Sequence, residues 1–220
     1  MVQSKRPVSF YLFIAFIASF IVFSSGVGIG LFIDELKSAS VSSSITDLQN
    51  SIVDAELELL MFDYFGGNVS CNYLILKSEE LGEQSSKLGE RLDIFERSNQ
   101  INEEGYLTLK EDYTRVLIKD WLTLEDIKKS CEANYSTILY FYSNTRCFQC
   151  ENQAYVLNYY KNMLKSNVLI FAIDSDMNIS IVKMLVYNYG INTYPSLVVD
   201  GVLNTGYQNI TILGKTLGVQ

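Results

Sequence analysis

The first pattern along the chain is an apolar run without a charged residue, from Ser9 to Ile33. Its 25 residues would let a helix cross a hydrocarbon layer of about 30 Å. Lys5 and Arg6 precede the run and two acids follow it, which favours a cytoplasmic N-terminus and an extracytoplasmic remainder. We therefore predict a single-pass membrane anchor of the signal-anchor type over residues 1–34. A cleaved signal peptide is the competing interpretation.

The next region, residues 35–134, has apolar positions at alternating spacings of three and four, which indicates amphipathic helices. One stripe contains Ile45, Leu48, Ile52, Ala55, Leu59 and Phe62, a second contains Leu74, Leu81, Leu88, Leu92 and Phe95, and a third contains Leu109, Tyr113, Val116, Leu117, Leu124, Ile127 and Cys131. Each stripe can be buried if the helices pack against one another. We therefore predict a helical hairpin or bundle here.

Residues 135–220 show a different pattern, in which short apolar runs alternate with helix-like stretches. The runs Thr137–Tyr142 and Val168–Ile173 are typical of buried strands, and another run follows Pro195. Helix-like stretches cover 154–164 and 179–188. This order predicts a third region in which strands and helices alternate along the chain.

Two cysteines stand at the first predicted strand-to-helix junction, in Cys147-Phe148-Gln149-Cys150. Unpaired N–H groups and the helix dipole favour an anion at a helix N-terminus, so the first thiol is favoured as thiolate. Arg146 adds a positive charge beside it and would lower its pKa. Only a thiolate attacks a disulfide, and the second thiol is close enough to close onto the first. Half of a zinc site and an inert structural pair are the alternatives.

The CxxC pair, the element order around it and Pro195 together resemble the thioredoxin superfamily, over about residues 136–218. The resemblance implies an α/β thioredoxin-like fold, in which helices flank a central sheet. It also implies that Cys147 attacks, that Cys150 resolves the mixed disulfide, and that Pro195 is a cis proline facing them.

By the same resemblance, Tyr194 would present its backbone to an extended substrate segment. Phe148 lies between the two thiols, where the loop is expected to be exposed, and could hold apolar segments of unfolded clients; packing within the protein is the alternative. The superfamily usually has a buried acid six residues before the first cysteine, where this chain has Phe141. The proton acceptor for Cys150 is therefore open, and Glu151 is a candidate.

The other two cysteines, Cys71 and Cys131, lie at the start of the second predicted helix and the end of the third. In an antiparallel hairpin these two ends meet, so we predict a structural disulfide. Closing a loop of about 60 residues would stabilise the fold by roughly 4 kcal/mol on the chain-entropy estimate. A relay with the CxxC pair and a four-cysteine zinc site are the alternatives.

The charged residues divide by region and exclude several functions. The net charge is -8; residues 34–134 carry 21 acids and 10 bases, a net of -11, and residues 135–220 carry 4 acids and 5 bases, a net of +1. An acidic chain has no electrostatic basis for binding nucleic acid. The chain has no histidine, which excludes His-based catalysis, and no nucleotide-binding motif. We predict no metal and no cofactor.

Together these features predict a membrane-anchored, exported thiol–disulfide oxidoreductase that acts on protein thiols and disulfides. The thiolate-stabilising helix terminus and the absence of a buried acid favour an oxidant or isomerase over a reductase. Its partners would be client proteins, the membrane, and a membrane protein that exchanges electrons with the dithiol. A non-catalytic binding or assembly protein and an extracytoplasmic reductase are the alternatives.

Overall fold

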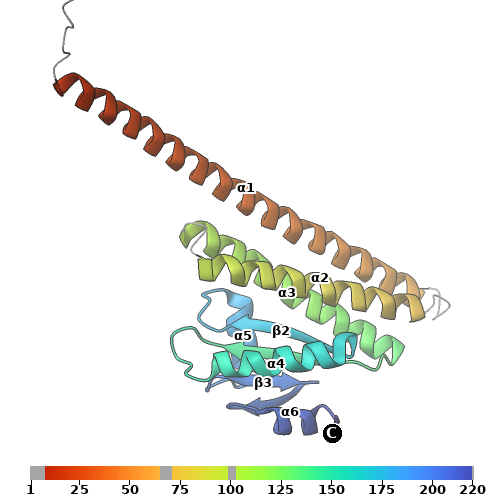
Figure 1. The fold of residues 1–220 in the computed structure, drawn as a ribbon. Helices are drawn as coiled ribbons and strands as arrows, with labels where there is room; N and C mark the ends of the chain where they lie inside the picture. Colours follow the sequence, from red (N-terminus) through yellow and green to blue (C-terminus); the bar gives the residue numbers. More distant parts are fainter. Residues whose placement is uncertain (1–7, 65–70, 99–102, 220) are drawn as a thin grey trace, which may run out of the picture.

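The computed structural model describes residues 8–64, 71–98 and 103–219 (Figure 1). Three long helices come first, and a mixture of strands and shorter helices follows. The elements are α1 (Val8–Tyr64), α2 (Cys71–Ser98), α3 (Glu103–Cys131), β1 (Ser136–Tyr142), α4 (Cys150–Leu164), the 3₁₀ turn η1 (Lys165–Asn167), β2 (Val168–Asp174), α5 (Ser180–Asn188), β3 (Ser196–Val199), β4 (Val202–Thr205) and α6 (Ile210–Thr216).

The apolar stripes of the first three helices face one another. On α1, the stripe is buried at Ile45, Leu48, Ile52 and Ala55 and half-buried at Leu59, and on α2 it is buried from Leu74 to Leu92. The third stripe contributes Leu117, Leu124 and Ile127 to the same core. The side chains of Phe62 and Phe95 lie outside the described residues. The spacing of apolar residues therefore located these helices and the faces that they bury.

Figure 1 shows that the three helices form a layer on one side of a sheet whose strand order is β2-β1-β3-β4. The strands β1 and β2 are parallel, with Leu139 opposite Phe171, whereas β3 is antiparallel to β1 and to β4. The runs of β1 and β2 are almost continuously apolar because both faces of the sheet are covered. Asp200 and Gly201, at φ of 48° and 81°, make the tight turn between β3 and β4.

The two faces of the sheet belong to different cores. Leu139 and Phe171 join the core that contains α1, α2, α3 and α5. Ile138 and Tyr140 point the other way and pack with residues of α4 and α6. The helical layer therefore shares one continuous core with the sheet.

The predicted fold class is wrong. Three helices of 57, 28 and 29 residues precede the first strand, so the protein is mainly helical with a small, mixed four-stranded sheet. Of these, α2 and α3 pack against one face of the sheet and α1 packs against α2 and α3, so the helices do not form a region ahead of a self-contained α/β domain with a central sheet. The physical reason is that α1 alone does not bury all the apolar surface of α2 and α3. The rest of that surface is buried against β2.

The predicted membrane anchor is wrong as well, and with it the single-pass localisation. Within the part of the chain that the structure describes, no helix has both the length and the hydropathy needed to cross a bilayer. The apolar run is not an element of its own, because α1 continues from it without a break to Tyr64.

A carboxyl group is buried between α2 and α3. Asp120 is fully buried, and the hydroxyl of Ser85 donates a hydrogen bond to its Oδ2. Its Oδ1 has no hydrogen-bond partner among the described residues. Burial raises the pKa of Asp120 to about 7, against the smaller lowering effect of the Ser85 hydrogen bond. The folded state therefore binds this proton more tightly than the unfolded chain.

Replacement of Asp120 by asparagine is expected to remove a pH-dependent loss of stability. The pKa is raised from 3.8 to about 7 in the folded state. The stabilisation that the fold gains from the protonated Asp120 is therefore complete below pH 3.8 and is lost as pH rises through 7. At pH 8, Asp120→Asn should be more stable by about 1–3 kcal/mol. Urea unfolding from pH 4 to 8 measures the difference, with the exposed Asp126→Asn on the same helix as control. A variant less stable than wild type at pH 8 would contradict the assignment.

Candidate active site

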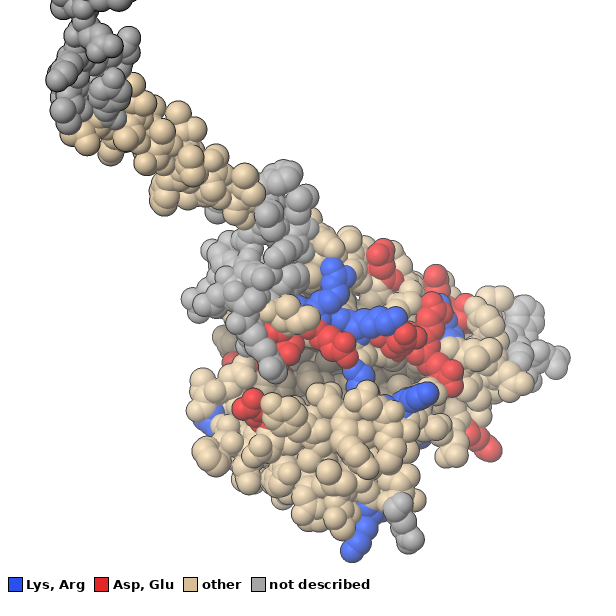
Figure 2. All heavy atoms as spheres, viewed as in Figure 1, with Lys and Arg blue, Asp and Glu red and all other residues tan. Residues whose placement is uncertain are grey.

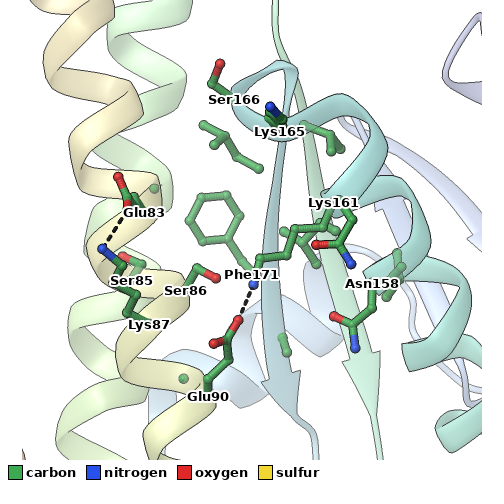
Figure 3. A pocket seen from close by; sticks show the side chains of 18 of the residues that line it. Glu83, Ser85, Ser86, Lys87, Glu90, Asn158, Lys161, Lys165, Ser166 and Phe171 are labelled. Carbon is green, nitrogen blue, oxygen red and sulfur yellow. Dashed lines mark hydrogen bonds and ion pairs between the residues drawn. The ribbon is translucent and has the colours of Figure 1, made fainter.

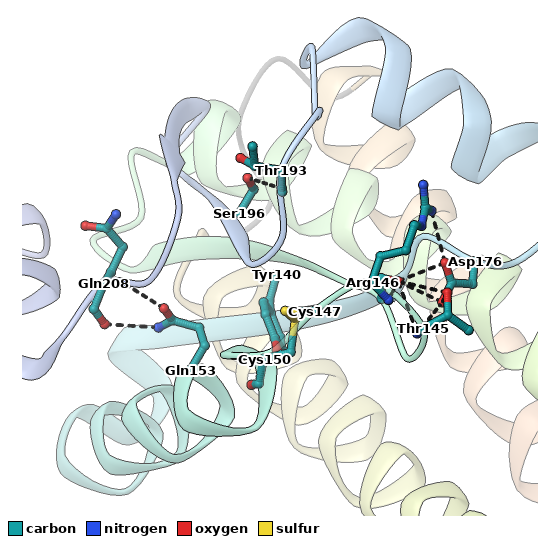
Figure 4. Close-up of a disulfide and its surroundings, with 11 residues drawn as sticks. Tyr140, Thr145, Arg146, Cys147, Cys150, Gln153, Asp176, Thr193, Ser196 and Gln208 are labelled. Carbon is teal, nitrogen blue, oxygen red and sulfur yellow. Dashed lines mark hydrogen bonds and ion pairs between the residues drawn. A yellow bond between two sulfur atoms is a disulfide. The ribbon is translucent and has the colours of Figure 1, made fainter.

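The two cysteines of the CxxC motif lie where β1 ends and α4 begins (Figure 4). Five consecutive residues of β1, from Thr137 to Phe141, are buried, and the chain then leaves the sheet in a short loop. Cys147 and Cys150 are joined by a disulfide, with Cα atoms 5.6 Å apart. The pair is therefore fixed at the carboxyl edge of the two parallel strands.

The helix begins at Cys150, earlier than the sequence pattern indicated, so Cys147 precedes its first turn. No side chain caps this turn among the described residues, which leaves its N–H groups to stabilise an anion. Cys147 is half-buried, whereas Cys150 is only 8% exposed. An incoming sulfur therefore reaches Cys147 more easily than Cys150.

Two buried polar side chains hold the start of α4 in place. The hydroxyl of Tyr140, on β1, donates a hydrogen bond of 2.7 Å to the carbonyl of Cys150. Burial raises the pKa of Tyr140, so this hydroxyl stays protonated and can act as the donor. Gln153 is fully buried and exchanges two hydrogen bonds with the main chain of Gln208, at 2.8 and 3.2 Å. These contacts tie the second cysteine to the sheet and to the segment before α6.

The structure brings the Tyr194–Pro195 segment to the same edge of the sheet. The peptide bond between these residues is cis, and Pro195 is buried. Phe141 of β1 pairs with Ser196 of β3, which places Pro195 beside the end of β1, where the loop to Cys147 starts. Tyr194 is half-buried and packs against the apolar cluster that contains Cys150, as Cys147 also does. The predicted substrate-contacting backbone thus lies next to the predicted redox pair.

A carboxylate that sequence analysis did not single out organises the loop before Cys147. Asp176 accepts hydrogen bonds from the Ser143 hydroxyl at 2.9 Å and from the backbone and hydroxyl of Thr145 at 3.1 Å. It also pairs with Arg146 at 3.0 Å. Burial alone would raise the pKa of Asp176, but the hydrogen bonds outweigh it and hold that pKa below its ordinary value.

Arg146 does not lie against the thiols as the sequence suggested. Figure 4 shows its guanidinium turned towards Asp176, away from the disulfide. It also lies over the ring of Tyr194, 5.2 Å from the ring centroid. Its charge is therefore shared with a carboxylate, and its visible contacts join the loop before Cys147 to the Tyr194–Pro195 segment.

Phe148 and Glu151 occupy exposed positions beside the pair. The Phe148 side chain is 97% exposed, which leaves it available to an apolar client segment. Glu151 is exposed in the first turn of α4.

A buried ion pair connects the helical layer to the same edge of the sheet. Lys110 of α3 and Asp174, the last residue of β2, have side chains only 10% and 6% exposed, and their Nζ and Oδ2 atoms are 2.6 Å apart. Asp174 also accepts a hydrogen bond from Asn144 at 3.1 Å and from the backbone of Asp176 at 2.9 Å. The loop before Cys147 is therefore anchored to α3 through this pair.

The outer cysteines, Cys71 and Cys131, form a disulfide with Cα atoms 5.4 Å apart, at the beginning of α2 and the end of α3. It joins the ends of two helices that pack side by side, as the hairpin geometry requires. All four sulfurs are thus bonded in two pairs. In this oxidised structure they do not form a four-thiolate zinc site.

Comparisons with known proteins add little to this geometry. No protein-family model and no curated protein matches the chain. A solved structure described as "Structure of a malarial protein" is similar over 38% of this chain and 93% of its own, at 16% identity and a TM-score of 0.33. A likeness of that size carries no argument about fold or function.

Proposed function

We propose that the protein is a thiol–disulfide oxidoreductase that acts on protein thiols and disulfides through Cys147 and Cys150. The observation that carries the proposal is the position of this pair. It is held at the uncapped N-terminus of α4, with Cys147 the more accessible residue and the Tyr194–Pro195 segment beside it. The sequence resemblance to the thioredoxin superfamily, which rests on the CxxC motif and the proline, supports the same chemistry.

In the reducing direction, the Cys147 thiolate attacks one sulfur of a client disulfide. A bond forms between Cys147 and that sulfur, and the other client sulfur leaves as a thiolate. The Cys150 thiolate then attacks Cys147, closes the Cys147–Cys150 disulfide and releases the second client thiolate. Two electrons have passed from the protein to the client.

In the oxidising direction, the same steps run backwards. A client thiolate attacks Cys147 of the disulfide, and Cys150 leaves as a thiolate. A second client thiolate then attacks the mixed disulfide, which forms the client disulfide and releases Cys147. The N-terminus of α4 stabilises a Cys147 thiolate and hence the reduced form, which favours an oxidant or isomerase.

Equilibration of the full chain in glutathione buffers tests the proposal, with alkylation and mass mapping of each cysteine. The Cys147–Cys150 pair is expected to open and close at about -120 to -180 mV. A value near about -270 mV would instead mean a reductase. The Cys71–Cys131 disulfide serves as the internal control and is expected to stay closed. A Cys147–Cys150 pair that stays closed throughout, as Cys71–Cys131 is expected to do, would overturn the proposal.

A further inference from the structure

The strand β2 forms one edge of the sheet. In the part of the chain that the structure describes, β2 pairs with β1 alone. Successive residues of a strand turn their N–H and C=O groups to opposite sides, so every second residue of β2 directs both groups away from β1. An edge of this kind is a template for another extended chain unless something covers it.

A groove of about 890 Å³ runs along this edge between α2 and α4 (Figure 3). Its floor consists of the β2 residues from Val168 to Ala172. On the α2 side, small residues keep the wall close to the sheet: a Cβ atom at Gly82 would lie 2.6 Å from Leu169. On the α4 side, Leu157 and Ala154 make the wall apolar near the strand. The helices α2 and α4 therefore stand on either side of the β2 edge and leave the edge itself open.

Charge is distributed unequally between the walls. Glu79, Glu80, Glu83 and Glu90 of α2 line the groove together with one base of the same helix, Lys87, which pairs with Glu83 at 2.6 Å, and Lys161 and Lys165 line it from the opposite side. Figure 2 shows acidic side chains, with basic ones among them, on the helical side of a hollow between the helices and the sheet. Lys161 reaches across to Glu90, 2.6 Å away, but both side chains are partly exposed and such a pair is weak.

We infer that this groove binds an extended segment of another polypeptide, which adds as a strand to β2. A strand directs successive side chains to opposite walls. The α2 wall, on which acids outnumber bases, selects basic side chains at every second position. Ala154 and Leu157, where the α4 wall is apolar, select apolar side chains at the positions between them. Main-chain hydrogen bonds to β2 supply affinity, and the two walls supply specificity. The inference does not depend on the redox chemistry of Cys147.

The probe is a fluorescein-labelled peptide of nine alternating lysine and valine residues, and binding is measured by fluorescence anisotropy. The full chain carries Cys147→Ser and Cys150→Ser, so that binding and the proposed function succeed or fail separately. The lysine–valine peptide is expected to bind, and a glutamate–valine peptide of equal length is expected to bind at least about tenfold more weakly. Equal binding of the two peptides, or no binding of the first, would overturn the inference.

Methylation of backbone nitrogens tests the strand geometry. All lysine N–H groups of an extended peptide face one side and all valine N–H groups face the other. Methylating one set should abolish binding, because that set faces β2, and methylating the other set should leave it within about threefold. If both methylated peptides bind alike, strand addition is excluded.

Charge reversal on the α2 wall provides the matched variants. Glu79→Lys/Glu83→Lys is expected to weaken binding of the lysine–valine peptide at least about tenfold. Asp47→Lys/Asp126→Lys makes the same change in net charge at exposed positions away from the groove, and should leave binding within about threefold. All four positions are exposed, so both variants should fold, and circular dichroism checks this. Equal loss in both variants would show that net charge alone attracts the peptide and would overturn the inference.

Discussion

Replacement of Cys147 by serine is expected to reduce the rate of thiol–disulfide exchange by about a thousandfold or more, to the uncatalysed rate. A serine hydroxyl is not ionised near neutral pH and cannot form a disulfide, so neither direction of the proposed reaction can start. The measurement is the rate at which the full chain exchanges with a peptide disulfide in a defined glutathione buffer.

Replacement of Cys150 by alanine is expected to have a different result from replacement of Cys147. The first attack remains possible, but no protein thiol can resolve the product. Mixed disulfides between Cys147 and clients should therefore accumulate, and they appear as high-mass bands that disappear with reductant. Cys147→Ser should give none of these bands.

Gln149→Ala is the matched control for both cysteine variants. Gln149 is exposed between the two cysteines, and the structure gives it no part in exchange. Its rate should stay within about threefold of wild type. Retained turnover in Cys147→Ser, with the Gln149→Ala rate unchanged, would refute the assignment of Cys147 as nucleophile.

The contrast between these two variants follows from local features that the sequence already contained. The spacing of Cys147 and Cys150, the apolar run before them and Pro195 are all visible along the chain, because each is a short-range pattern. The same holds for the buried stripes of the three long helices. Local spacing therefore predicted the elements, and it placed the two cysteines at the junction between two of them.

The fold class and the membrane anchor were predicted wrongly because both depend on more than local spacing. A stripe such as that of α2 shows which face is buried but not what buries it. Here the partners of α2 include Leu169 of β2, which lies close to Gly82 although the two residues are nearly 90 positions apart in the chain. The charge difference between residues 34–134 and 135–220 indicated two separate regions, but the helical layer and the sheet share one core.

The loop contacts of the candidate site were missed for a related reason. Asp176 stands next to Ser175 and Asp174 in a short acidic stretch after a predicted strand, and nothing in that stretch identifies its partners. Parallel strands end at the same edge of a sheet, so acids after β2 lie beside the loop after β1. That rule could have indicated Asp176 as a contact of the loop before Cys147. No sequence pattern links Lys110 to Asp174, which are 64 positions apart.

Replacement of Lys110 by methionine is expected to destabilise the fold by about 3–5 kcal/mol, because it leaves a buried carboxylate without its counter-charge. Methionine keeps much of the length and apolar surface of the lysine stem, so the loss reports the ammonium group rather than a cavity. Urea unfolding of the full chain with intact disulfides measures the free energy. Lys119→Met is the control, because Lys119 pairs with Glu56 at a partly exposed site on the same helix. Its loss should be about 0.2–1 kcal/mol.

The double variant Lys110→Met/Asp174→Asn distinguishes loss of a charge partner from loss of packing. Asparagine keeps an oxygen that can accept the 2.9 Å hydrogen bond from the backbone of Asp176, and it removes the uncompensated charge. The double variant should therefore recover most of the stability that Lys110→Met loses, since replacing both members of a buried pair costs far less than removing one. If it is no more stable than Lys110→Met, the ion pair is not what α3 contributes at this edge. Recovery would mean that the helical layer holds the loop before Cys147 through a single buried charge, which couples the two parts of the molecule at the candidate active site.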